Sequence, residues 1–155
     1  MPAQEDYIER HIAILVRLIA QIVTLRLSGK IEEAAAVMMQ AQEKLFGCPA
    51  SDFAVLPLDD QLNLLARGMS PEQAREKMVG YALLLREAGV SYLEQDRKEL
   101  AAGAFKTALH ILLVVSLNYS GRDDALADLI RSTLANAPVE QVDAPIREML
   151  EAMAS

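Results

Sequence analysis

The residues best suited to chemistry in this sequence are two histidines, one cysteine and several pairs of adjacent carboxylates. A zinc ion needs three or four convergent ligands, and neither His11 nor His110 has a partner at metal-binding spacing. Cys48 is expected just beyond the end of a helix, where the helix dipole disfavours a thiolate. No histidine lies near it in the sequence to activate it. The sequence therefore predicts no metal centre, no cofactor site and a structural role for all three residues.

Paired carboxylates could serve in general acid–base catalysis, and the chain has such pairs at Glu32–Glu33, Asp59–Asp60 and Asp123–Asp124. All three pairs are expected at the start of a helix, where acidic side chains cap backbone N–H groups and favour the positive end of the dipole. The chain also contains no phosphate-binding loop, dinucleotide fingerprint or nucleophile elbow. We therefore expect a protein that is not an enzyme and that binds no cofactor.

Composition and charge restrict the classes of partner. A length of 155 residues is typical of one domain, and a hydrophobic content of 52% exceeds the usual share. The net charge is −7 and no basic stripe is present, which argues against nucleic acid and an anionic membrane. The acidic N-terminal segment is unlike a signal peptide, and a single cysteine suits a reducing compartment. We expect a cytoplasmic protein with apolar surface left for a protein partner.

Apolar residues recur every three or four positions along most of the chain, and the period-two alternation of strands is missing. We predict an all-α single domain of about seven helices, near residues 5–28, 31–46, 60–66, 71–95, 98–118, 123–135 and 143–153. The clearest start signal is Ser70-Pro71-Glu72-Gln73, which matches a capping box. The irregular middle, 48–69, with a short turn predicted at 51–56, could serve as a lid, a degenerate repeat or a spacer.

Two antiparallel helical hairpins, at about 5–46 and 71–118, are the predicted core of the domain. A polar turn at 95–98 joins the helices of the second hairpin, and Gly29 marks the turn of the first. Small residues stand where the helices must approach closely, and larger ones fill the seam between them. The residues predicted to make this packing are Gly29, Ala34, Met38, Ala41, Gly89, Tyr92, Ala101, Phe105 and Ala108.

The second hairpin resembles a tetratricopeptide repeat, whose pattern is W-x₂-L-G-x₂-Y, A-x₃-F and P. Gly89-x₂-Tyr92 and Ala101-x₃-Phe105 match that pattern, and the first hairpin is a weaker copy of it. The departures are Leu85 for the tryptophan, Ala88 for the leucine, Asp96 for the usual turn glycine and Leu113 for the proline. The DYIERHI opening, the LxxxGKxEEA turn and this hairpin together resemble a small bacterial family of tetratricopeptide-like proteins, and the resemblance covers most of the chain. The resemblance implies a right-handed superhelix, with a bundle of ordinary hairpins as the alternative, and it implies no catalytic residues.

In tetratricopeptide repeats the first helix of each hairpin lines a concave groove. The resemblance implies that the lining here comprises Val16, Ile19, Val23, Arg26 and Leu27 from one hairpin, and Leu83, Arg86, Val90, Leu93 and Glu94 from the other. An apolar groove in water tends to be covered. A second copy of the chain, the C-terminal helix with Ile146, Met149, Leu150 and Met153, or an amphipathic helix or peptide of another protein could cover it.

We rank self-association first among these coverings, because the first helix has more apolar sides than one groove can bury. The predicted function is a non-enzymatic protein–protein interaction or scaffold module that forms a homodimer through an apolar helix face. The alternative is a small-molecule-binding protein, or a helical enzyme, with a cavity between the hairpins.

Overall fold

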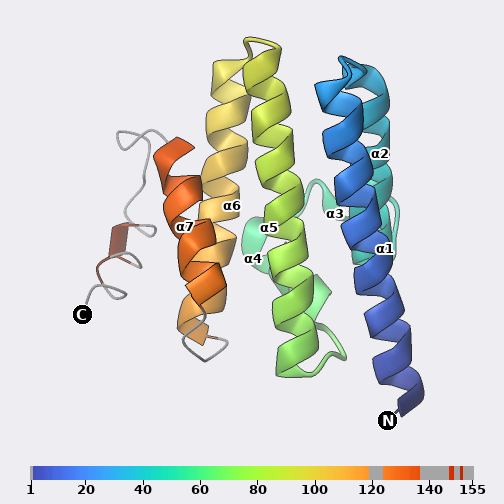
Figure 1. The fold of residues 1–155 in the computed structure, drawn as a ribbon. Coiled ribbons are helices and arrows are strands. Elements are labelled where there is room, and N and C mark those ends of the chain that lie inside the picture. Colours follow the sequence, from blue (N-terminus) through green and yellow to red (C-terminus); the bar gives the residue numbers. More distant parts are fainter. Residues whose placement is uncertain (1, 119–123, 137–146, 149–150, 152–155) are drawn as a thin grey trace.

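The computed structural model describes residues 2–118, 124–136, 147, 148 and 151, and it describes the side chains of these residues except 2–12, 124, 125 and 136 (Figure 1). The described residues are helical with no strand, which confirms the all-α prediction for them. Their seven helices are α1 (Pro2–Leu27), α2 (Ile31–Phe46), α3 (Ala50–Phe53), α4 (Leu58–Ala66), α5 (Pro71–Glu94), α6 (Lys98–Asn118) and α7 (Asp124–Asn136). The predicted helix at 143–153 falls almost wholly outside the described residues.

Two antiparallel helix pairs, α1–α2 and α5–α6, stand side by side in the molecule (Figure 1). The turn of the first pair contains Gly29 with a φ of 78°. Asp96 occupies the equivalent place in the second turn with a φ of 58°, a left-handed conformation that glycine adopts more easily. The predicted capping box is present, because the Ser70 hydroxyl accepts from the Gln73 backbone N–H and the Gln73 side chain accepts from the Ser70 N–H.

Helix α5 is the centre of the fold and contacts α1, α2, α4 and α6. Its small residues allow this close packing. A Cβ atom added at Gly89 would lie 2.8 to 2.9 Å from three ring atoms of Phe105 on α6. One at Gly80 would collide with the Leu15 side chain of α1. Both glycines are buried, so α5 has close neighbours on two sides.

The helix predicted near residues 60–66 is present as α4, but the segment predicted as a turn at 51–56 begins within a helix, α3. A carboxylate oxygen of Glu43 on α2 accepts a hydrogen bond of 3.0 Å from the N–H of Ala50, at the start of α3. Phe53 and Leu65 are each 1% exposed, and Leu62 is 6% exposed. Contacts with α2 and α5 therefore set the structure of this segment, which belongs to the core.

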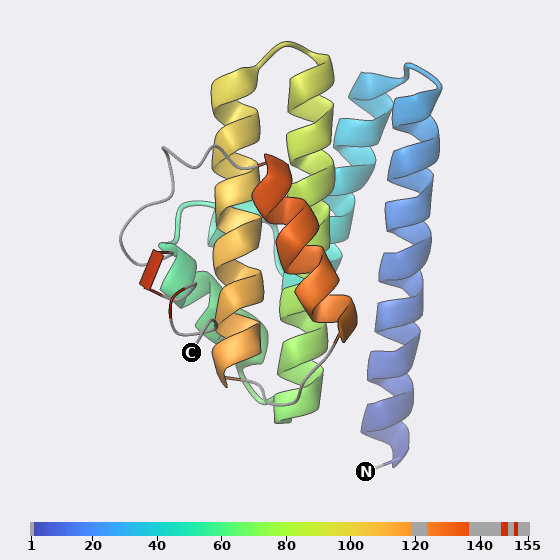
Figure 2. The ribbon, with the colours of Figure 1, turned by 60° about the vertical axis from the view of Figure 1, so that its left-hand side comes forward.

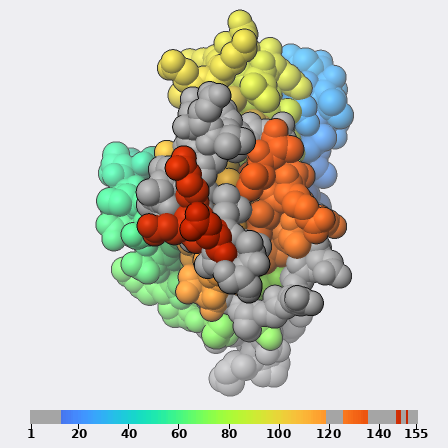
Figure 3. Space-filling view, turned by 90° about the vertical axis from the view of Figure 1, so that its left-hand side faces the viewer, coloured from blue at the N-terminus to red at the C-terminus, as the bar shows by residue number. Residues whose placement is uncertain are grey.

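Helix α7 packs against α6 and crosses the α5–α6 pair (Figures 2 and 3). Leu126, Ile130 and Thr133 are buried in this contact. The Arg86 side chain of α5 also donates a hydrogen bond of 3.1 Å to the Ser132 hydroxyl. Helix α7 thus covers part of the outer surface of the second pair.

Candidate functional site

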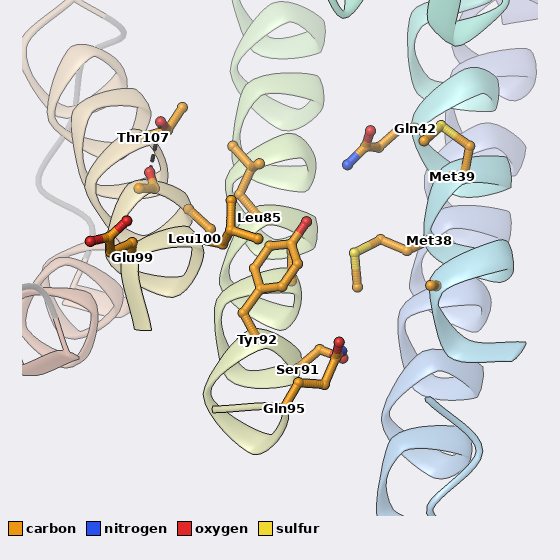
Figure 4. Close-up of a pocket in the computed structure, with 14 residues that line it drawn as sticks. Met38, Met39, Gln42, Leu85, Ser91, Tyr92, Gln95, Glu99, Leu100 and Thr107 are labelled. Carbon is orange, nitrogen blue, oxygen red and sulfur yellow. Dashed lines mark hydrogen bonds between the residues drawn. The ribbon is translucent and has the colours of Figure 1, made fainter. Parts of the chain in front are cut away.

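A pocket of about 550 Å³ lies between α2, α5 and α6 (Figure 4). Because its walls come from both helix pairs, it lies between the two hairpins. Its apolar lining includes Met38, Met39, Leu85, Ala88, Leu100 and Ala104. Met39 and Leu100 are each 47% exposed, so solvent reaches apolar wall surface. Gly103 also faces this space, and a Cβ added there would meet no atom within 4 Å.

The polar groups of the pocket are few and mostly neutral. Gln42, Ser91, Gln95 and Thr107 contribute to the lining, and the Thr107 hydroxyl donates within its own helix to the Gly103 carbonyl at 2.9 Å. Among the described lining residues, Glu99 in the first turn of α6 is the one formally charged side chain. An apolar surface with one carboxylate favours a ligand that is apolar and either neutral or cationic.

An aromatic cluster joins α2, α3 and α5 next to this pocket. The rings of Phe46 and Phe53 stack with centroids 4.1 Å apart, and Phe46 meets Tyr81 edge to face at 5.0 Å. The Tyr81 hydroxyl donates to the side-chain oxygen of Gln61 at 2.8 Å. The Gln61 amide nitrogen then donates to the Phe53 carbonyl at 3.0 Å. A buried polar network thus connects α3, α4 and α5.

Replacing Tyr81 with phenylalanine is expected to lower the free energy of unfolding by about 1–2 kcal/mol, because the buried Gln61 oxygen loses its donor. Burial also raises the pKa of Tyr81. The folded state therefore favours the protonated phenol, and this contribution is fully present below about pH 10 and falls as the pH rises further. Urea unfolding from pH 7 to 11 should show the difference between wild type and variant shrinking at the alkaline end.

The comparison with the Tyr81→Phe variant cancels the titration of other groups. Burial lowers the pKa of Lys77, so its contribution changes in the opposite direction and rises with pH as the amine loses its charge. A stability difference that stays constant from pH 7 to 11 would contradict the assigned role of the Tyr81 hydroxyl.

The predicted groove residues are either exposed or half-buried, and no residue of the set is fully buried. Arg26 reaches from α1 to α5, where its guanidinium lies 2.8 Å from a carboxylate oxygen of Glu94 and 3.4 Å from one of Glu87. Arg86 is bonded to α7 instead. Val16, Leu27, Leu93 and Glu94 are exposed, whereas Ile19, Val23, Arg26, Leu83, Arg86 and Val90 are half-buried. The structure thus brings Arg26 and Glu94 together and places Arg86 beside α7.

The predicted packing residues lie mainly inside the molecule. Those that are buried are Ala34, Met38, Ala41, Gly89, Ala101, Phe105 and Ala108. Tyr92 is half-buried in the pocket lining, and the Arg97 guanidinium lies 5.9 Å from its ring centroid. The sequence interpretation missed Phe53, Gln61 and Tyr81 as a connected group. The three- and four-residue spacing of apolar residues indicates which of them are buried, but it does not show which of them contact one another.

The described residues hold no cluster of three or more histidine, cysteine or acidic side chains suited to a metal ion. Cys48 is half-buried, and His110 is half-buried on α6. Helix α6 is long and apolar enough to span a membrane, yet half of its most apolar window is buried in the fold. Because the core helix of a soluble protein can have the same length and composition, this feature is weak evidence for a membrane span.

In class, the described part of the chain is an all-α protein built on antiparallel helix pairs. Comparison with models of protein families, with curated proteins and with solved structures finds no match for the chain.

Proposed function

We propose that this protein is a non-enzymatic interaction module that self-associates through the outer face of α1. We define the α1 outer face as Ala13, Val16, Ala20, Val23 and Leu27. Their spacing alternates between three and four residues, which is the repeat of a coiled-coil seam. The single observation that carries the proposal is the exposure of large apolar side chains on this face, because Val16 is 60% and Leu27 73% exposed on a helix that buries Leu15 and Ile22 elsewhere. Val23 is half-buried at the edge of the face.

A second copy of the chain suits this face better than an unrelated surface. In an antiparallel pair of α1 helices centred on Ala20, each Leu27 lies opposite the Ala13 of the other copy. Large residues then meet small ones across the seam, which is the arrangement that close helix packing requires. The face carries no charged residue, so the pairing buries no charge.

The tetratricopeptide-like arrangement is part of the same proposal. Helix α5 contacts both α1 and α2, and α7 contacts α6. Successive hairpins of a stacked helical array make contacts of this kind. This pattern supports a stack of hairpins in which α1 lies at an end, where its outer face has no neighbour from the described chain.

Size-exclusion chromatography with light scattering tests the proposal. The wild-type chain is expected to elute as a dimer, and Val16→Glu is expected to elute as a monomer at the same concentration. The matched control is Val55→Glu, because Val55 is 83% exposed but lies away from α1, and this variant should stay dimeric. A wild-type monomer at several hundred micromolar, or a dimer that survives Val16→Glu in a folded protein, would reject self-association through this face.

A further inference from the structure

Helix α5 already holds one short helix of the chain on its surface. Helix α4 packs against α5 and α2, with Gln61, Leu62 and Leu65 buried (Figure 1). The pocket of about 550 Å³ lies between α2, α5 and α6, nearer the α5–α6 turn (Figure 4). Tyr81 of the aromatic cluster lies one helical turn before Leu85, the first α5 residue of the pocket lining.

The pocket has the length of a short helix. On one side its lining runs from Leu85 of α5 to Gln95, the residue that follows the end of α5, which is about 15 Å along the helix axis. Helix α4, with nine residues, is about 13 Å long. The pocket is therefore about as long as α4 and can accommodate an amphipathic helix of that size.

The chemistry of the walls also suits a helix. Ala88, Gly103 and Ala104 are small, so the backbone of a bound helix can approach closely. Met38 and Met39 on α2 lie across the pocket from Leu85 and Tyr92 of α5 (Figure 4), and methionine side chains adapt to the shape of an inserted apolar residue. Helix-in-groove recognition uses apolar anchors at three- and four-residue intervals.

We propose that this pocket binds a short amphipathic helix of a partner protein. Its apolar side chains insert between α2 and α6, and a lysine or arginine at one end pairs with Glu99. The commitment to a cationic end rests on Glu99 as the charged group of the described lining. The site is separate from the α1 outer face, so it does not depend on self-association.

Selection from a displayed library tests this proposal without knowledge of the natural partner. The library encodes twelve-residue helical peptides with randomised faces and ends, and it is selected in parallel on the full wild-type chain and on Gly103→Phe. The phenyl ring would occupy the pocket, since Gly103 opens into it. Wild type is expected to enrich peptides with apolar residues at three- and four-residue spacing and a basic end. Their affinity for Gly103→Phe should be at least tenfold weaker.

A charge reversal tests the polar contact. Glu99→Lys is expected to weaken the binding of the selected basic peptides by roughly five- to tenfold and to strengthen the binding of peptides with an acidic end. Glu72→Lys is the matched control, because Glu72 is also exposed in the first turn of a long helix but does not line the pocket. It should leave both affinities within twofold of wild type, and equal effects of the two reversals would contradict the contact with Glu99.

Circular dichroism must show that each variant folds, and Leu100→Glu replaces Gly103→Phe if the phenylalanine variant does not. Identical enrichment on the wild-type and blocked proteins would overturn the proposal. So would binding of a free amphiphile such as decylammonium with no enrichment of peptides, because the pocket would then be a small-molecule site. The selection can be repeated on Val16→Glu, so that failure of self-association and failure of helix binding are separate results.

Discussion

Replacing Phe53 with alanine is expected to lower the free energy of unfolding by about 3–5 kcal/mol, the typical cost of deleting a buried phenyl ring. Phe53 is 1% exposed and stacks on Phe46. Its carbonyl also accepts from Gln61, so the cavity would lie beside a buried hydrogen-bond network. For a chain of this size, the melting temperature should fall by roughly 10 °C or more. Urea unfolding followed by circular dichroism measures the change.

The matched control for Phe53→Ala is Val55→Ala in the same segment. Val55 is 83% exposed, and its replacement should change stability by no more than about 0.5 kcal/mol. If both variants were equally stable, Phe53 would not hold α3 in the core, and the middle segment would be a spacer after all.

Replacing Gly89 with valine is expected to lower the free energy of unfolding by about 2–3 kcal/mol through overpacking. A Cβ at this position would already lie 2.8 Å from the Phe105 ring, and Phe105 is 1% exposed with no free space to move into. Valine would therefore separate α5 from α6 or displace the ring. Thermal unfolding and urea titration should both show the loss.

Gly103→Val is the control for Gly89→Val, since both glycines lie within helices of the same hairpin. A Cβ at Gly103 has no neighbouring atom within 4 Å. The free energy of unfolding of Gly103→Val should therefore differ from that of wild type by no more than about 0.5 kcal/mol. Phe105→Leu combined with Gly89→Val should recover part of the loss, which a double-mutant cycle measures as a coupling energy. If Gly89→Val and Gly103→Val lost equal stability, helix propensity and not contact with Phe105 would explain the effect of both substitutions.

Local signals allowed much of the fold to be predicted. The bounds of α2 and α6 agree with the expected ranges 31–46 and 98–118, because turn residues and apolar spacing lie within each segment. The Ser70 capping box is also local, with its two partners three residues apart. Gly89 and Phe105 could be placed in one seam because a short turn joins their helices.

Features that depend on distant residues could not be predicted in this way. Tyr81 and Gln61 are twenty residues apart, and nothing near either residue indicates that they are bonded. Helix α3 begins with a hydrogen bond to Glu43 and is held by Phe53 against α2, so its own four residues do not specify it. The lining of the pocket is harder still to predict, because its side chains come from three helices of two hairpins.

The walls of the pocket come from both hairpins, with α2 on one side and α5 and α6 on the other. A ligand in the pocket must contact both hairpins, and it will therefore oppose their separation. An occupant at a hundred times its dissociation constant would add about 2.7 kcal/mol to the folded state. The melting temperature of the protein therefore reports whether the pocket is occupied. The measurement can be made in a mixture from which the ligand has not been purified.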